Sequence, residues 1–160
     1  MPRKKLLKLD YETLKSEPKK KPLKRTLKPP KTVAKLKKDA DKYWSLATRY
    51  RFANPDGTAE CVTCGVRKPI KELQCGHFMS RRFNNTRFSE LNTAPQCVGC
   101  NMFRSGEQYK FSLFIEDYYG KGTAEQIRKD AQEFHKLTRE ELEEIISDAK
   151  TQIDFYLKQG

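Results

Sequence analysis

The sequence predicts an α+β domain over residues 32–160, preceded by a basic arm over residues 1–31. Three observations predict it. Apolar residues recur at helical spacing near both ends of the domain, turn-forming residues divide its middle into short segments, and Lys and Pro dominate the arm. Only 36% of the 160 residues are hydrophobic, so the core is modest for this length and a cross-link between segments would help to stabilise it.

The formal net charge of the chain is concentrated in the arm and the residues that directly follow it. Residues 1–38 contain 15 Lys and Arg against 3 Asp and Glu, whereas the rest of the chain contains 18 of each kind. Lys runs, several prolines and little apolar periodicity cannot offset the entropy of ordering by burial, so we predict that residues 1–31 are disordered. The cations of the arm, including Lys19, Lys20 and Lys21, favour nucleic-acid phosphates, because neutralised phosphates release counterions. A solubility tail or a targeting signal is the alternative.

A helix is predicted over residues 33–52, where one apolar face repeats at intervals of three and four residues. The residues of this face are Leu36, Ala40, Tyr43, Trp44, Ala47 and Tyr50. The turn-forming run from Asn54 to Gly57 ends the helix. Trp44 could stack on a nucleobase, but its place in the apolar face favours packing in the core.

Two Cys-x-x-Cys pairs lie near the two ends of a module over residues 58–106. The pairs are Cys61 with Cys64 and Cys97 with Cys100. A two-residue gap lets both thiolates of a pair turn onto one ion, and four sulfurs complete the closed tetrahedron of structural zinc. Gly65 would allow the tight turn after the first pair. The chain has no apolar signal segment and no run long enough to cross a bilayer, which indicates a reducing compartment and makes disulfides the weaker alternative.

The segment between the cysteine pairs is polar and basic. A strand is predicted within residues 68–78, with His77 near its end, and a polar connection follows over residues 80–89 with Asn84 and Asn85 as its turn. The connection carries three arginines, Arg81, Arg82 and Arg87. A guanidinium fork matches phosphate oxygens, so these side chains are candidate DNA contacts, and an ordinary solvated loop is the alternative.

Three helices are predicted over residues 107–158. The first follows a break at Ser105 and Gly106, and capping boxes predict the starts of the other two at Thr123 and Thr138. The apolar residues of the first are Tyr109, Leu113, Phe114 and Tyr118, and those of the last, over residues 139–158, are Leu142, Ile145, Ile146, Ala149, Ile153, Tyr156 and Leu157. The last set is expected to face the core of its own chain, and the seam of a homodimer is the alternative.

Several short motifs follow one another within the module. They are Cys61-x-x-Cys64-Gly65, Gly76-His77-Phe78, Arg87-Phe88-x-Glu90-x-Asn92, Gln96-Cys97-x-x-Cys100-Asn101 and Ser105-Gly106. Their order and spacing resemble the HNH nucleases of the ββα-metal class, and more closely the phage lambda NinG (Rap) family of recombination endonucleases. The resemblance covers about residues 42–157. It implies a zinc-stapled ββα fold, cleavage of branched DNA such as Holliday junctions and D-loops, and a role in phage recombination.

Hydrolysis of a phosphodiester needs a base for the attacking water and a cation for the developing charge. His77 is the expected general base, because a neutral imidazole accepts a proton near neutral pH. By the resemblance, Asn101 would ligate a catalytic Mg²⁺ or Mn²⁺, ions that prefer oxygen ligands, and Asn92 would brace the loop that orients the base. The alternatives are an Asn101 that caps a helix and an Asn92 that serves an ordinary turn.

One position departs from the family pattern. Members carry Asp where this chain has Gln74, three residues before His77, so the site for the catalytic ion would lose one negative charge. Gln74 and Gly76 point to the same side of a strand, and the glycine would leave room for Gln74 to approach the ion. Cys75 points to the other side and is expected to pack inside the domain rather than to act as a catalytic thiol.

Together these features predict a metal-dependent, structure-specific DNA endonuclease of phage recombination in the cytoplasm of an infected bacterial cell. It would hold a structural zinc ion and a catalytic divalent ion, and it would bind DNA and no membrane. A zinc-finger protein that binds DNA without cutting it is the first alternative. An HNH nuclease with another role, restriction-like or associated with packaging, is the second. Only the family resemblance, and no residue pattern, indicates branched DNA.

Overall fold

The computed structural model describes residues 30–159. Residues 1–29 lie outside that range, and with them the predicted phosphate contacts Lys19, Lys20 and Lys21 and nearly all of the predicted arm. The described residues form an α+β domain of helices and small sheets, which is the fold class that the sequence predicts. None of the helices over these residues combines the length and the apolar character needed to cross a bilayer.

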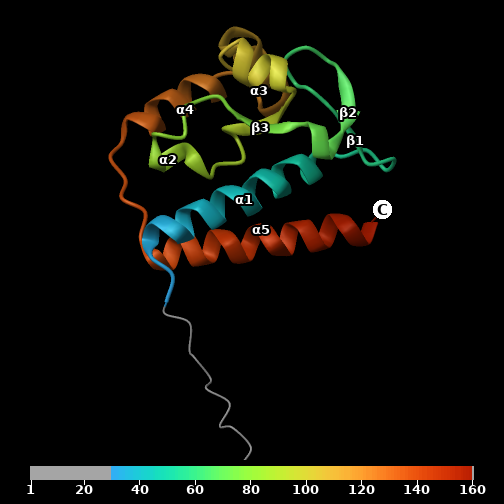
Figure 1. Cartoon of the computed structure of the whole chain (residues 1–160). Helices are drawn as coiled ribbons and strands as arrows, with labels where there is room; N and C mark the ends of the chain where they lie inside the picture. Colours follow the sequence, from blue (N-terminus) through green and yellow to red (C-terminus); the bar gives the residue numbers. More distant parts are fainter. Residues whose placement is uncertain (1–29, 160) are drawn as a thin grey trace, which may run out of the picture. The chain divides into compact units, whose positions relative to one another are not determined.

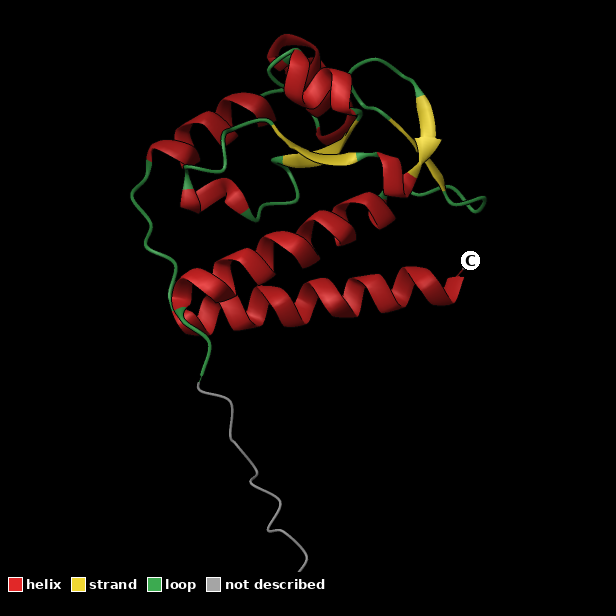
Figure 2. Ribbon diagram, viewed as in Figure 1, coloured by secondary structure: helices red, strands yellow, loops and turns green. Residues whose placement is uncertain are grey.

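Two long helices, α1 (Val33–Arg51) and α5 (Arg139–Gln159), lie side by side along one face of the domain (Figures 1 and 2). Their buried contact residues are Leu36, Ala40 and Ala47 of α1, and Leu142, Ala149 and Ile153 of α5. The small alanine side chains let the two helix axes approach closely. Most of the apolar stripe of the last helix therefore packs within its own chain, but Leu157, near its end, is 56% exposed.

Side-chain caps begin both long helices. Thr32 Oγ1 accepts a hydrogen bond from the Lys35 N–H at 3.3 Å at the start of α1. The capping box predicted at Thr138 is confirmed, because the Glu141 N–H donates to Thr138 Oγ1 at 3.2 Å and the Thr138 N–H donates to the Glu141 carboxylate at 2.7 Å. Both caps depend only on residues three positions apart, which is why the sequence reveals them.

The two middle helices, α3 (Gln108–Tyr119) and α4 (Thr123–Gln132), are joined by a different kind of cap. The capping box predicted at Thr123 is wrong. The carboxylate of Glu116, in the preceding helix, accepts hydrogen bonds from the Gly122 N–H at 2.5 Å and the Ala124 N–H at 2.8 Å. This carboxylate satisfies the free N–H groups of α4 and favours its positive end.

The buried face of α3 also differs from the apolar residues that predict the helix. Phe111 and Ile115 are fully buried, whereas Tyr109, Leu113 and Tyr118 are exposed. Phe111 packs edge-on against Phe78, just beyond β3, with ring centroids 6.0 Å apart. A helix of aromatic residues on several sides has no single stripe in its sequence, so its tertiary partners decide which side is buried.

The strands form two antiparallel pairs. β1 (Thr58–Glu60) pairs with β2 (Arg67–Pro69), and a short 3₁₀ helix, η2 (Ile70–Glu72), leads from β2 to β3 (Gln74–His77). β3 pairs with β4 (Thr93–Gln96), with Gln74 opposite Gln96 and His77 opposite Thr93. β3 and β4 pack on α1.

Two side chains determine how β3 and β4 pack. Trp44 of α1 is 8% exposed and its indole N–H donates to Thr93 Oγ1 at 3.2 Å, so Trp44 belongs to the core, as predicted. Gly76 accommodates Gln96, because a Cβ at Gly76 would lie 2.2 Å from Gln96 Oε1. The prediction that Gly76 makes room for Gln74 is therefore wrong, since the buried Gln96 fills the space over the glycine.

The connection between β3 and β4 contains a short helix, α2 (Asn84–Arg87), where the sequence predicts a turn. The helix begins at the asparagine pair, and the side chains of both asparagines are hydrogen-bonded to residues far along the chain. Asn84 Nδ2 donates to the His135 carbonyl at 2.9 Å, and Asn85 Nδ2 donates to the Asp130 carbonyl at 2.7 Å. These bonds hold α2 against α4 and against the segment that follows α4.

A π-helical turn, η3 (Gly99–Phe103), follows β4. Three consecutive residues with positive φ then separate η3 from α3, namely Ser105 (49°), Gly106 (81°) and Glu107 (49°). This is the break that the sequence predicts at Ser105 and Gly106. A left-handed backbone conformation costs free energy in residues other than glycine, so hydrogen bonds around Ser105 and Glu107 must stabilise it. One of these is the Gly106 N–H bond to the Cys100 carbonyl, at 2.9 Å.

Candidate functional site

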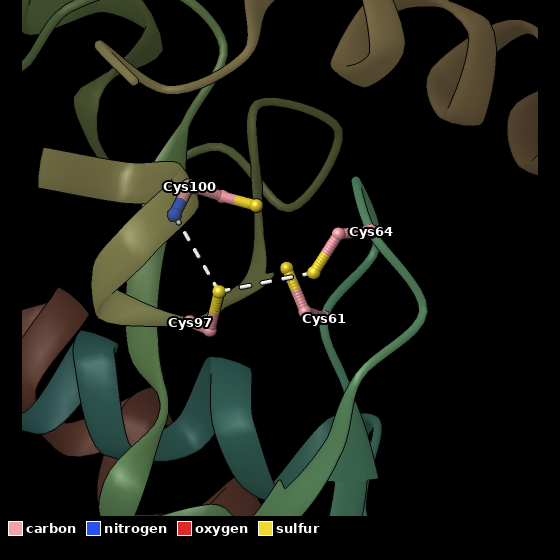
Figure 3. Close-up of side chains that lie close together, drawn as sticks. All are labelled: Cys61, Cys64, Cys97 and Cys100. Carbon is pink, nitrogen blue, oxygen red and sulfur yellow. Dashed lines mark hydrogen bonds between the residues drawn. The ribbon is translucent and has the colours of Figure 1, made fainter. Parts of the chain in front are cut away.

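The four paired cysteines converge on one point. Their sulfur atoms all lie within 4.8 Å of one another, and Cys64 Sγ is 3.8 Å from Cys97 Sγ (Figure 3). Four sulfurs at a Zn–S distance of about 2.3 Å form a tetrahedron with edges of roughly 3.8 Å. Cys61, Cys64, Cys97 and Cys100 are free thiols rather than disulfides. The cluster therefore fits a structural metal ion such as zinc, with these four residues as its ligands.

The backbone brings the four sulfurs together from three elements. Cys61 directly follows β1, Cys97 directly follows β4 and Cys100 lies in η3. Gly65, with a φ of 73°, closes the first turn through a hydrogen bond from its N–H to the Cys61 carbonyl at 2.8 Å. The Asn101 N–H closes the second turn on the Cys97 carbonyl at 2.9 Å. A metal ion in this cluster would join the two sheets to η3.

Hydrogen-bond donors surround the sulfurs. Arg104 Nη2 donates to Cys100 Sγ at 2.7 Å, and Thr63 Oγ1 is 3.3 Å from Cys61 Sγ. Burial opposes ionisation of Cys61, but hydrogen bonds from Thr63 and from backbone N–H groups lower its pKa to about 6. A backbone hydrogen bond lowers the pKa of Cys64, but burial and the neighbouring sulfurs together raise it to about 12. Four adjacent thiols cannot all ionise unaided, because the thiolates would repel one another. A bound cation would allow all four to be thiolates.

Sequence reasoning did not single out Thr63 or Arg104. Both had a local signal, because Thr63 lies between the cysteines of the first pair and Arg104 follows Cys100 by four residues, the spacing of helical neighbours. Arg104 also donates to Glu107 Oε1, at 2.5 Å, so it connects the cysteine cluster to the start of α3. Second-layer partners of this kind orient metal ligands and offset their negative charge.

A cleft of about 770 Å³ opens between β3, the segment that follows β3, and η3. Its walls are made by Ser45, Gln74, Cys75, His77, Phe78, Met79, Ser80, Arg81, Arg82, Phe83, Asn101, Met102, Ser105, Gly106 and Gln108. Of these described residues two are arginines and none is an aspartate or a glutamate. The cleft therefore favours an anion. It brings together five of the predicted site residues, namely His77, Asn101, Gln74, Arg81 and Arg82.

His77 ends β3 with its ring half-buried in the cleft wall. Its Nε2 lies 3.1 Å from the Arg87 carbonyl oxygen. A carbonyl oxygen can only accept a hydrogen bond, so we assign the proton of the neutral ring to Nε2 and the lone pair to Nδ1. Burial lowers the pKa of His77 to about 4, although the backbone carbonyls of Arg87 and Cys75 oppose this shift. The ring is therefore neutral at pH 7, and it is a weaker base than an ordinary histidine.

Asn101 and Gln74 contact each other in the cleft wall. Asn101 Nδ2 donates to Gln74 Oε1 at 2.7 Å. Within residues 30–159 no donor reaches Asn101 Oδ1, so this amide oxygen is free. Asn101 lies inside η3, and the cap position of α3 is Glu107. Asn101 therefore caps neither helix, which removes the alternative reading of this residue.

The cleft fits a hard divalent cation only in part. Asn101 Oδ1 is a suitable oxygen ligand, but Gln74 Oε1 is already paired with Asn101, and the cleft walls supply no carboxylate among the described residues. Mg²⁺ and Mn²⁺ take about six oxygen ligands, so water and an anionic substrate would have to supply most of them. Asn101 offers such an ion a free amide oxygen.

Asn92 is fully buried and closes the loop between β3 and β4. Its Oδ1 accepts from the Met79 N–H at 2.6 Å, and its Nδ2 donates to the carbonyls of Met79 at 3.0 Å and Thr86 at 2.9 Å. Its own carbonyl accepts from the Phe78 N–H at 2.9 Å. Asn92 thus holds the segment directly after His77, which is a bracing position rather than a place in the cleft wall.

The three predicted DNA-contacting arginines separate into two groups. Arg81 and Arg82 are exposed in the cleft wall, and the Arg82 guanidinium lies 4.5 Å from the ring centre of Phe83. Arg87 is largely buried and donates two hydrogen bonds to the Asp41 carboxylate, at 2.8 and 2.5 Å. The Arg87 guanidinium is thus occupied by Asp41 and by the Arg81 carbonyl, to which Nη1 donates, and the Arg87 carbonyl oxygen contacts His77.

Cys75, the fifth cysteine, is half-buried and contributes to the cleft wall. Burial raises the pKa of its thiol to about 11. The thiolate is therefore scarce at neutral pH, and the residue lies outside the four-cysteine cluster. Its interior position is only partly as predicted, since the open cleft reaches it.

The comparisons with known proteins agree with the sequence motifs. A family model described as "Bacteriophage Lambda NinG protein" matches residues 3–158. No curated protein and no solved structure shows significant similarity to the chain. The matched range includes all four clustered cysteines and the whole cleft.

Proposed function

The chain belongs to the NinG family of phage recombination-region proteins, and on this premise we propose that it is a metal-dependent endonuclease that cuts branched DNA. The observation that carries the proposal is the convergence of a neutral His77, the free Asn101 oxygen and two arginines on one cleft whose described walls lack carboxylates. A phosphodiester is an anion, so such a cleft attracts it. The base and the candidate metal ligand then lie beside the bound phosphate.

The order of elements around the cleft supports an HNH-like arrangement of the ββα-metal class. β3 carries His77 at its end, antiparallel β4 follows, and η3 carries Asn101 directly after β4. Asn92 braces the loop between the two strands. In this proposal the cysteine cluster holds a structural zinc ion that fixes η3, and with it Asn101, against the hairpin.

The residues of the cleft suffice for the proton transfer and the positioning. His77 Nδ1 takes a proton from water, the oxygen of that water forms a bond to phosphorus, and the bond between phosphorus and the leaving sugar oxygen breaks. The leaving oxygen takes a proton from solvent. Arg81 and Arg82 hold the phosphate oxygens during this displacement. Asn101 would hold a divalent ion, and such an ion would stabilise the charge that develops on the phosphate and leaving oxygens.

The wider context follows from the family and from the charge of the chain. The basic segment over residues 1–31, with Lys19, Lys20 and Lys21, adds sequence-independent attraction to DNA phosphates in this proposal. The protein acts in the cytoplasm of the infected bacterial cell, where the phage DNA recombines. Branched DNA is the proposed substrate because recombination produces it.

A second candidate function rests on one contact. Because Asn101 Nδ2 occupies Gln74 Oε1, and the described cleft walls hold no carboxylate, the site holds a cation less strongly than a site with aspartate would. This favours a zinc-finger protein that binds DNA at the cleft without cutting it. The two candidates differ in cleavage and agree in zinc binding and DNA binding.

Incubation of the full-length protein with labelled linear, forked and four-way DNA, with and without Mg²⁺ or Mn²⁺, tests the proposal. We expect metal-dependent cuts in the forked and four-way DNA. Binding without cleavage in either metal would support the zinc-finger function. Equal cleavage of linear DNA would support an HNH nuclease of another kind, such as one with a restriction-like or packaging role.

A further inference from the structure

Two adjacent residues of η3 carry exposed apolar side chains, and the first of them lines the cleft. Met102 contributes to the cleft wall and is 63% exposed, and Phe103 beside it is 82% exposed. One exposed phenylalanine is ordinary on a protein surface, and Phe134 at 94% is an example in this chain. Phe103 differs from Phe134 in its position, because it lies two residues after Asn101 and directly after Met102, and both of those residues line the basic cleft.

The backbone that carries these side chains is held firmly. The Arg104 N–H donates to the Gly99 carbonyl at 3.0 Å, and the Gly106 N–H donates to the Cys100 carbonyl at 2.9 Å, so two bonds join the segment after η3 to its first two residues. Cys100 is fully buried in the four-cysteine cluster. Gln74 Nε2 lies 3.6 Å from Met102 Sδ, which connects Met102 to the residue that contacts Asn101. The exposed apolar tip therefore has a rigid base.

The charges around the tip indicate what it contacts. Arg81 and Arg82 lie in the same cleft wall as Met102, and the described walls contain no acidic residue. An apolar protein partner has no need of such a basic surface, whereas DNA presents phosphates together with apolar base faces. Exposed apolar side chains beside cationic groups are the means by which proteins insert between base pairs and unstack them.

We propose that Met102 and Phe103 form a wedge that stacks on unpaired or unstacked bases of the bound DNA. The inference rests on the proposed function of the cleft and deepens it by naming the substrate feature. Separating a stacked base step costs free energy, and the cost is smallest where bases are already unpaired, as at a branch point. The wedge then gives this chain a preference for branched DNA through its own residues.

A fluorescence experiment tests the wedge without any cleavage. The full-length protein is mixed, in buffer without Mg²⁺ or Mn²⁺, with a four-way junction that carries 2-aminopurine beside the branch, and with a matched linear duplex. The variants are Phe103→Ala, Phe103→Trp and Phe134→Ala, the last a matched loss of an exposed ring in the segment that joins α4 to α5. Each exposed ring is removed without disturbing a buried contact, so folding is preserved.

We expect wild type, Phe103→Trp and Phe134→Ala to raise the 2-aminopurine fluorescence, because the base next to the branch becomes unstacked from its neighbours. Phe103→Ala should lose this rise and bind the junction more weakly by roughly one to two orders of magnitude, with linear-duplex binding unchanged. If Phe103→Ala matches wild type in both 2-aminopurine fluorescence and junction affinity, the wedge proposal is wrong, and the exposed surface has another partner. A wild type that unstacks the base but never cuts DNA overturns the proposed endonuclease and leaves the wedge standing.

Discussion

The carbonyl oxygen of Arg87 lies 3.1 Å from His77 Nε2, and the guanidinium of the same Arg87 pairs with Asp41 of α1. One residue thus fixes the ring of the candidate base through its backbone and anchors the β3–β4 connection to α1 through its side chain. The bond to the carbonyl favours the tautomer with its proton on Nε2. The position of the proton on the His77 ring and the orientation of that ring therefore depend on contacts of Arg87 outside the cleft.

Removal of a clustered cysteine should unfold the domain. Cys97→Ser is expected to lose zinc and cooperative unfolding, because structural zinc supplies folding free energy on the order of 10 kcal/mol in small modules. Elemental analysis should find one zinc ion per chain in wild type, and circular dichroism should follow the melting. Cys75→Ala, the matched control outside the cluster, should keep both zinc and fold. Zinc-free protein with an unchanged melting curve would contradict the structural role.

His77 should stay neutral in mildly acidic solution. With its pKa lowered from 6.5 to about 4, nearly all of the folded protein carries the neutral ring at pH 5.5, where an ordinary histidine is mostly charged. Because the unfolded chain takes up this proton first, His77 makes the fold lose stability as the pH falls from 6.5 towards 4. Imidazole ¹⁵N chemical shifts should show the proton on Nε2, with zinc content measured at each pH as the control. A charged His77 ring at pH 6 would refute the assignment.

Arg81 and Arg82 should act on DNA, and Arg87 on stability. Arg81→Gln or Arg82→Gln is expected to weaken DNA binding and to reduce the slope of log K against log salt by about one each, because each removes one phosphate contact. Arg87→Gln, the matched loss of charge, should keep the slope and lower the free energy of unfolding by about 1 to 3 kcal/mol, because it breaks the bonds to Asp41. Filter binding and denaturant unfolding measure these effects. An unchanged salt slope in both variants would show that neither Arg81 nor Arg82 contacts a DNA phosphate.

A carboxylate at position 74 should strengthen cation binding. Gln74→Asp is expected to lower the Mg²⁺ concentration for half-maximal cleavage and to tighten Mn²⁺ binding measured by electron paramagnetic resonance, since a hard cation prefers a charged oxygen. Gln108→Glu adds the same charge to another part of the cleft wall and is the control for a general effect of charge. If both variants tighten Mn²⁺ equally, position 74 is no ligand site.

The features that the sequence reveals are local ones. Ligand spacing in each cysteine pair and the Thr138 capping box depend on residues three positions apart, and the structure contains both. The candidate site could be assembled from sequence only through family motifs, because His77 and Asn101 lie on different elements. Their meeting in one cleft depends on the pairing of β3 with β4.

The features that the sequence does not reveal depend on distant partners. The sequence predicts that Arg87 lies in a loop and is available to DNA, but its side chain is bound by Asp41, 46 residues away. The sequence predicts that Gly76 leaves room for the side chain of Gln74, but Gln96 of the opposite strand fills that room. Asn84 and Asn85 read as a turn, but bonds to residues beyond α2 place them in a helix. In each case a tertiary contact overrides the local preference.

The most direct test of the account is the cleavage rate of His77→Ala on saturating four-way DNA in Mg²⁺ or Mn²⁺. We expect a loss of roughly two to four orders of magnitude, the usual contribution of a general base, with zinc content, fold and DNA affinity unchanged. His135→Ala, which removes the other histidine, should cut at the wild-type rate. A His77→Ala protein that cuts as fast as wild type would contradict the proposed mechanism.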